Sequence, residues 1–320
     1  MCADSRSLPV VPAGATPPAY LPRESRTAAG VSERSAAEEG GSKRNLDYPP
    51  APEPLPYPVP DNHTHMDFRD GRISVGVAEA LDTANAVGVS GAIQVGCDVE
   101  SSRFAVAAAE ADPRVLAAVA IHPNDAPRLA EAGELDAALA VIEELAAHPR
   151  VRAVGETGLD YFRTGPGGVA AQKESFGRHI DIARRHGKAL QIHDRDAHND
   201  VVKLLLATEL PEKVVFHCFS GDAELARTCN EHGWYMSFSG TVTFKNSHDL
   251  RAALSVAKPE LVLVETDAPF LTPHPYRGRP NASYLIPQTV RFMAGHLGTE
   301  LEVLCRQLAA NTETVYGSFA

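Results

Sequence analysis

The sequence predicts a (β/α)8 TIM barrel preceded by a disordered N-terminal extension. From residue 61 onward, short apolar or β-branched runs alternate with stretches of helical periodicity, which is typical of βαβ units and a parallel sheet. Eight such runs in about 260 residues fit a closed barrel better than an open doubly wound sheet. The first run also lacks the glycine fingerprint of a dinucleotide-binding fold, which disfavours that alternative.

The individual elements follow from this alternation in chain order. The runs predicted to be strands are residues 61–65, 91–97, 115–122, 151–156, 189–193, 213–219, 234–239 and 261–266. The stretches predicted to be helices are residues 77–87, 102–111, 135–147, 170–186, 196–207, 222–231 and 248–257, with 287–296 and 300–310 after the last strand. Helices between the strands are the connections that a parallel sheet requires.

Residues 1–55 differ in composition from the rest of the 320-residue chain. They are rich in Ala, Pro, Ser, Gly and charged residues, contain few large apolar side chains and end in a dense run of prolines. Such a segment buries too little apolar surface to offset the entropy cost of ordering its backbone. We therefore predict a disordered leader over residues 1–55 and a single barrel domain over residues 56–320. The leader is interpreted either as an arm for an unknown partner or as a segment without a role in catalysis.

The charge balance limits the kinds of partner. The formal net charge is −11, and the first 60 residues hold six Lys and Arg against seven Asp and Glu, so −10 belongs to the remainder. An acidic body disfavours long-range capture of duplex DNA, which relies on a basic surface that releases counterions. Nucleic acid held locally by metal ions and a few arginines remains compatible with this charge.

The cysteines and the apolar runs indicate the compartment. Five cysteines are scattered without a CxxC pair, which predicts reduced thiols in a cytoplasmic protein rather than a disulfide framework. No apolar run reaches the length of a membrane span, and the N-terminus lacks a basic region followed by an apolar core. We therefore expect a cytoplasmic protein without a membrane partner.

Side chains that bind metals lie at or near the ends of five predicted strands. They are His63, His65, Glu156, His193, His217 and Asp267. The carboxyl ends of barrel strands share one mouth, so these groups are expected to gather there. His63 and His65 are two residues apart and therefore point to the same face of a strand.

Each of these residues has a simpler interpretation when it is taken alone. A His-x-His pair is more often a surface or capping pair, Asp267 before Ala268-Pro269 fits a turn, and His217 fits a core histidine. Together, these simpler interpretations require six buried polar groups at one end of a barrel, each with its own partner. A shared pair of divalent cations satisfies all of them, so the pattern predicts a dimetal hydrolase.

Other polar residues on the strand ends and loops are candidates for contact with a substrate. His122 ends the third predicted strand and is expected to face the mouth. Arg163, Arg195 and Arg277 lie on loops where their guanidinium groups would bind phosphate oxygens, with a structural salt bridge as an equal alternative for each. Tyr161 is expected to pack on a sugar or a base.

Five blocks of sequence together resemble the signature of the TatD family, metal-dependent deoxyribonucleases of the amidohydrolase superfamily of barrel enzymes. The blocks are residues 62–67 (NHTHMD), 121–123 (IHP), 155–161 (GETGLDY), 217–221 (HCFSG) and 265–271 (ETDAPFL). All occur in order, and the resemblance runs from about residue 61 to the C-terminus, whereas the leader has no counterpart. The metal ligands that the resemblance implies are His63, His65, Glu156 and Asp267 for one ion, and His193, His217 and the bridging Glu156 for a second.

The expected activity is hydrolysis of DNA phosphodiester bonds, with single strands or ends preferred over duplex interiors. Its cofactors are two divalent ions (Mg, Mn or Zn) that activate a shared water, and Asp267 and Glu156 are the catalytic carboxylates, with Asp267 as the general base. Two alternatives remain open. A D-aminoacyl-tRNA deacylase or small-molecule ester or amide hydrolase would use the same metal centre. A non-catalytic scaffold would use the leader as its interaction arm.

Overall fold

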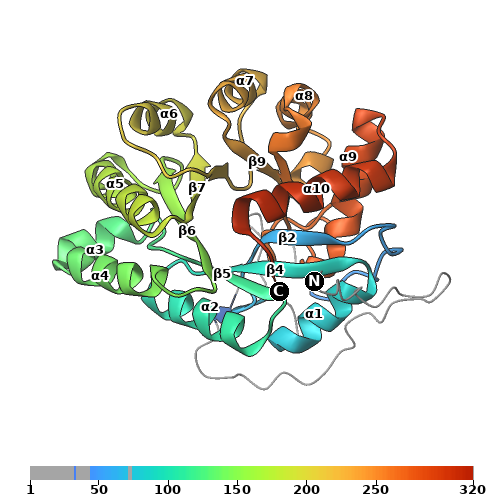
Figure 1. The fold of residues 1–320 in the computed structure, drawn as a ribbon, viewed down its shortest axis with the longest axis horizontal. Helices are drawn as coiled ribbons and strands as arrows, with labels where there is room; N and C mark the ends of the chain where they lie inside the picture. Colours follow the sequence, from blue (N-terminus) through green and yellow to red (C-terminus); the bar gives the residue numbers. More distant parts are fainter. Residues whose placement is uncertain (1–31, 34–43, 71–73, 320) are drawn as a thin grey trace, which may run out of the picture.

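The computed structural model describes residues 32–33, 44–70 and 74–319, and it confirms the predicted (β/α)8 barrel. Eight parallel strands follow one another around one sheet in chain order (Figure 1). They are β2 (Val59–Thr64), β4 (Val89–Val95), β5 (Val115–Val119), β6 (Val151–Asp160), β7 (Ala189–Arg195), β8 (Val214–Phe216), β9 (Tyr235–Phe238) and β10 (Val262–Val264). A separate parallel pair consists of β1 (Ser32–Glu33) and β3 (Phe68–Arg69).

The helices form a ring outside the strands, as Figure 1 shows. They are α1 (Val77–Ala86), α2 (Val99–Ala111), α3 (Ala126–Ala132), α4 (Leu135–Ala146), α5 (Val169–His186), α6 (His198–Leu206), α7 (Ala223–His232), α8 (His248–Val256), α9 (Ile286–Leu297) and α10 (Leu301–Tyr316), with the 3-10 turns η1 (Pro166–Gly168), η2 (Gly240–Thr243), η3 (Pro259–Leu261) and η4 (Ser283–Leu285). All predicted helices are present. The sequence missed α3, because its 7 residues, with a proline in the first turn, are too short for a periodic pattern. Among the described helices, none is long and apolar enough to cross a membrane.

The barrel strands are buried on both faces, because helices cover the outside and side chains fill the inside. Every residue of β5 and β10 is buried, and their sequences are Val-Leu-Ala-Ala-Val and Val-Leu-Val. Continuous apolar strands of this kind are typical of parallel sheets. The apolar runs that predicted the fold therefore form its core.

Hydrogen bonds close the barrel between its first and last strands. The backbone N–H of Asp267 donates to the carbonyl of His63 at 2.9 Å, and the N–H of His65 donates to the carbonyl of Ala268 at 2.7 Å. Buried Asp61 reinforces this seam, since its carboxylate accepts from the backbone N–H of Thr266 at 2.9 Å. The seam thus places His63 of β2 and His65, which follows it, directly beside Asp267.

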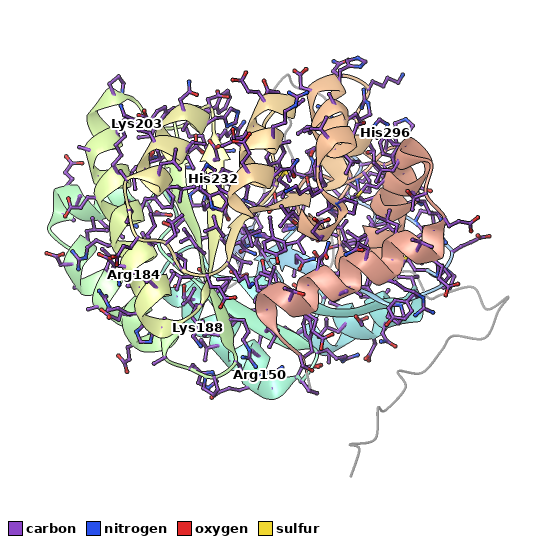
Figure 2. All side chains as sticks on the ribbon, turned by 45° about the horizontal axis from the view of Figure 1, so that its top comes forward. Arg150, Arg184, Lys188, Lys203, His232 and His296 are labelled. Atoms are coloured by element: carbon purple, nitrogen blue, oxygen red, sulfur yellow. The ribbon has the colours of Figure 1, made fainter. Side chains whose placement is uncertain are left out.

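Basic side chains seal the amino-terminal end of the barrel, the end opposite to the predicted site. Arg150 precedes β6 and Lys188 precedes β7, and both are labelled in Figure 2. Nζ of Lys188 donates to the carbonyl of Val151 at 2.7 Å, and Nη2 of Arg150 donates to the carbonyl of Val115 at 2.6 Å. These bonds satisfy backbone acceptors where the strands begin.

Two strands run farther toward the mouth than the sequence predicted. β6 continues past Glu156 to Asp160, and β7 continues past His193 to Arg195. Gly158 allows the extension, because it has a φ of +145° and a Cβ there would lie 2.1 Å from the carbonyl oxygen of His193. The polar sequence around this glycine does not resemble a strand, so the prediction stopped short.

Residues 44–55, which the sequence assigned to the disordered leader, lie against the barrel. Arg44 forms a buried ion pair with Asp70 through two bonds of 2.9 and 2.6 Å, and its Nε donates to the carbonyl of Gly278 at 2.9 Å. Leu55 is buried at the other end of the segment. The segment has few large apolar side chains, and one buried ion pair and a hydrogen bond to a backbone carbonyl help to hold it against the barrel. Residues 1–31 and 34–43 of the predicted leader lie outside the described residues.

Candidate metal centre

The six predicted metal ligands all lie toward the carboxyl ends of barrel strands. His63 belongs to β2, Glu156 to β6 and His193 to β7. His65, His217 and Asp267 follow β2, β8 and β10 within three residues. The structure therefore brings all six to the same mouth. Their atoms gather around the two oxygens of Glu156, and His217 also offers a ligand atom within 4.8 Å of His63 and Asp267.

One group surrounds the Nε2 atoms of His63 and His65, which lie 3.1 Å apart. Oε2 of Glu156 lies 3.5 Å from Nε2 of His63 and 3.7 Å from Nε2 of His65. Oδ1 of Asp267 lies 3.7 and 3.5 Å from the same two nitrogens. Two nitrogen and two oxygen atoms thus face one point from the ends of β2, β6 and β10.

The second group surrounds Oε1 of Glu156. Nδ1 of His193 lies 2.5 Å from this oxygen, and Nε2 of His217 lies 2.9 Å from it. Nε2 of His122, which the sequence analysis placed among the substrate-binding residues, lies 3.3 Å from the same oxygen. His122, Glu156 and His193 together offer ligand atoms within 4.8 Å of one another, so His122 belongs to the second group by position.

The electrostatics of the two groups fit divalent cations. Burial raises the pKa of Glu156, but the charges of His217 and His122 outweigh burial and hold this pKa well below its ordinary value. Burial lowers the pKa of His217, but Glu156 and Glu265 outweigh it and raise this pKa well above its ordinary value. The buried carboxylates therefore require nearby positive charge. Imidazole nitrogen and carboxylate oxygen are ligands that zinc and manganese accept, so the residues fit such ions.

Two acidic residues orient the histidines of the second group. Nε2 of His193 lies 3.3 Å from Oδ2 of Asp160, and Nδ1 of His217 lies 3.1 Å from Oε1 of Glu265. A carboxylate on one ring nitrogen fixes the tautomer and leaves the other nitrogen free to bind a metal. The sequence analysis assigned no role to Asp160 or Glu265, although both lie inside the quoted blocks.

The first group has a backbone partner and a thiol neighbour. Nδ1 of His65 lies 3.0 Å from the carbonyl of Val95 and donates to it, which turns Nε2 toward the carboxylates of Glu156 and Asp267. Sγ of Cys97 lies 3.7 Å from Oε2 of Glu156. Burial raises the pKa of the Cys97 thiol to about 12, so it is a protonated donor to this carboxylate. Its position directly after β4 is the signal that could have identified it.

Comparison with known proteins identifies the family. Residues 60–317 match the family model described as TatD related DNase. The chain belongs to the TatD family. This is the family that the five sequence blocks resemble.

The relatives are metal-dependent hydrolases of the same length as the barrel. The chain is 46% identical over 261 residues to an uncharacterized metal-dependent hydrolase, TatD, of Mycobacterium tuberculosis, a match that covers 80% of this chain and 97% of the relative. It is 36% identical over 255 residues to an uncharacterized metal-dependent hydrolase, YabD, of Bacillus subtilis, covering 79% and 94%. The crystal structure of YjjV, a TatD homologue from Escherichia coli, has the same fold, with a TM-score of 0.73, 24% identity and coverage of 81% and 98%. This TatD family protein is a metal-dependent hydrolase.

Of the three arginines predicted to contact a substrate, Arg163 and Arg277 lie on loops at the mouth of this TatD barrel, and Arg195 is the last residue of β7. With the described residues, the guanidinium groups of Arg163, Arg195 and Arg277 form no hydrogen bond or ion pair. Two of them lie over aromatic rings: Cζ of Arg195 is 4.0 Å from the ring centroid of Phe162, and Cζ of Arg277 is 4.4 Å from that of Phe244. The structural salt bridges that were the alternative are thus not observed in this part of the chain.

The hydroxyl of Tyr161, which the sequence predicted to pack on a sugar or a base, is hydrogen-bonded within the protein. Its hydroxyl donates to Oδ2 of Asp200 at 2.7 Å, and Nζ of Lys173 lies 2.5 Å from the same oxygen. The hydroxyl is therefore part of a small network between β6, α5 and α6. The neighbouring Phe162 has no such anchor and is exposed.

Proposed function

We propose that this protein hydrolyses DNA phosphodiester bonds at a centre of two divalent cations, with single strands or strand ends preferred. The observation that carries the proposal is the position of Glu156, because Oε2 faces the Nε2 atoms of His63 and His65 while Oε1 faces His193 and His217. A carboxylate placed in this way suits a bridge between two metal ions. The family description as a DNase supports DNA as the substrate.

The ligands divide between the two groups. The residues that would hold one ion are His63, His65, Glu156 and Asp267, and those that would hold the other are His193, His217 and Glu156, with His122 beside them. When bound, the pair of cations supplies Lewis acidity that lowers the pKa of a water and neutralises phosphate oxygens. Mixed nitrogen and oxygen ligands favour zinc or manganese over magnesium, which prefers oxygen.

Asp267 is the residue that accepts the proton of the attacking water. Burial raises the pKa of its carboxyl, but the hydrogen bond from His65 and the charge of His63 outweigh burial and lower this pKa. The carboxylate is therefore ionised and ready to accept. Asp267 also has a φ of +56°, in a turn that directs the residue after β10 back toward β2.

The arginines at the mouth would bind the charged backbone of the substrate. Arg163, Arg195 and Arg277 carry charge that no carboxylate among the described residues neutralises, and guanidinium groups bind phosphate oxygens in a bidentate way. The net charge of −11 opposes binding of a long duplex over a wide surface. A substrate held only by these arginines, over a short length at the mouth, is therefore better suited to be a single strand or a strand end than the interior of a duplex.

Product analysis tests this function. The metal-loaded protein is incubated with a single-stranded oligonucleotide, with supercoiled plasmid and with a D-aminoacyl-tRNA. We expect phosphomonoester ends from the oligonucleotide, formed faster than nicks in the plasmid. Release of free amino acid without any phosphomonoester would replace the nuclease with a deacylase, and equal rates on plasmid and oligonucleotide would contradict the preference for single strands.

A further inference from the structure

An exposed aromatic side chain lies at the mouth beside the second metal group. Of the large apolar side chains that are exposed among the described residues, only Phe162 is aromatic, with 61% of its surface exposed. It is the second residue after β6, in the loop that leads to α5. The guanidinium carbon of Arg195 lies 4.0 Å from the centroid of its ring.

The Phe162–Arg195 pair is fixed next to His193. Arg195 is the last residue of β7 and lies two residues after His193, so both side chains point to the same side of the strand. In the register of the barrel, Asp160 pairs with Arg195, and Asp160 also contacts His193. Phe162 follows Asp160 by two residues. Arg195 on β7 and the end of β6 that leads to Phe162 both therefore lie close to His193, a predicted metal ligand.

The packing of the protein does not explain why Phe162 is exposed. A single exposed apolar side chain is common on protein surfaces, but the Phe162 ring also carries the Arg195 guanidinium on one face, at the end of the barrel where the predicted metal ligands lie. The adjacent Tyr161 is partly buried against the core and hydrogen-bonded to Asp200, so it supplies the anchoring of this loop. Phe162 is thus available for a partner from outside.

We propose that Phe162 and Arg195 form a stacking subsite for one nucleobase next to the phosphodiester that is cleaved. Every base has an aromatic face, so a stack of this kind binds single strands with little dependence on sequence. The Arg195 guanidinium stabilises the stack through its cation–π contact and remains able to reach phosphate oxygens. This subsite rests on the proposed nuclease function and supplies a reason for the strand preference, because bases inside a duplex have both faces covered by their neighbours.

A pair of substrates separates base recognition from backbone cleavage. One is a short oligothymidylate, and the other is a strand of equal length with the same sugar–phosphate backbone but no bases. For Phe162→Ala, we expect kcat/KM on the oligothymidylate to fall about tenfold, the scale of one base–aromatic stack, with no change on the base-free strand. Phe162→Trp should restore cleavage of the oligothymidylate. Val303→Ala, which removes another exposed apolar side chain (58% exposed) from α10, is the control and should change neither rate.

Two outcomes overturn the subsite. An equal loss on both strands would assign Phe162 a structural role, and no loss on either strand would remove it from recognition. Binding to a strand that contains the fluorescent base 2-aminopurine reads the stack without cleavage: quenching by the wild-type protein but not by Phe162→Ala supports it. If the wild-type protein cleaves neither strand, the nuclease function fails, and the fluorescence result alone decides the subsite.

Discussion

Oε1 of Glu156 lies 2.9 Å from Nε2 of His217, across the barrel from β6 to the end of β8. The other oxygen of this carboxylate, Oε2, faces the Nε2 atoms of His63 and His65. One side chain therefore connects the two groups of candidate ligands.

Replacing the connecting carboxylate should remove activity. Glu156→Gln keeps the shape of the side chain but loses its charge, and it places an amide donor where an acceptor is needed. We expect kcat to fall at least about 100-fold, the scale on which loss of one preorganised electrostatic group lowers the rate. Bound metal, measured by atomic emission, should fall below two ions per chain. Glu174→Gln, on an exposed face of α5, is the matched control, and unchanged activity in Glu156→Gln would contradict the bridge.

Glu265 should affect metal affinity through His217. Its Oε1 lies 3.1 Å from Nδ1 of His217 and holds the ring with Nε2 toward Glu156. We expect Glu265→Gln to weaken metal binding by about 10–100-fold, as loss of such an orienting partner does. Excess metal should restore its activity, whereas it should not restore Glu156→Gln. A Glu265→Gln protein with normal metal affinity would show that the contact does not orient the ring.

Buried His179 should make stability depend on pH. Its Nε2 accepts from the backbone N–H of Ile121 at 3.0 Å, and burial lowers its pKa to about 4. The unfolded chain, with an ordinary pKa near 6.5, takes up a proton that the folded protein refuses, so stability falls as the pH drops from about 6.5 to about 4. The full loss from this residue is roughly 3 kcal/mol.

Urea unfolding at several pH values measures this dependence. The wild-type free energy of unfolding should decrease between about pH 6.5 and pH 4, and His179→Gln should show a shallower slope over the same range. The comparison of slopes removes the contributions of other titrating groups. Equal slopes in the two proteins would mean that His179 has the same pKa in the folded protein as in the unfolded chain.

The ion pair between Arg44 and Asp70 should stabilise the protein although Arg44 lies in the predicted leader. Both side chains are almost fully buried, at 2% and 0% exposed. Removing one partner of a buried pair leaves an uncompensated charge, so Arg44→Ala should lower the free energy of unfolding by about 3–5 kcal/mol. Arg128→Ala, which breaks an ion pair with Asp125 in which Arg128 is 65% exposed, should have little effect. Denaturant midpoints that agree between Arg44→Ala and the wild type would contradict this role.

Local sequence patterns were sufficient to predict the barrel and to predict which polar residues gather at its mouth. Apolar runs such as β5 and β10 alternate with helical stretches, and this alternation predicted buried strands. The position of His63, His193 and Asp267 relative to such runs predicted that they meet at one mouth. The TatD family was predicted from short blocks and is confirmed.

Local sequence patterns did not predict contacts between segments that lie far apart in the chain. The pairing of Arg44 with Asp70 and the approach of His122 to Glu156 depend on how the loops fold back, which no periodicity encodes. Phe162 was missed because a single phenylalanine in a loop is usually assumed to be buried. Only its exposure and the guanidinium of Arg195 on its ring indicate another role.

A cleavage time course on 5′-labelled single-stranded DNA tests the central claim most directly. The wild-type protein and Asp267→Ala are compared with magnesium, manganese or zinc, each with and without a chelator. A two-cation nuclease predicts a ladder of products that depends on metal, disappears with chelator and is absent from Asp267→Ala. Intact DNA after incubation with folded, metal-loaded wild-type protein, or an equal ladder from Asp267→Ala, would contradict the account.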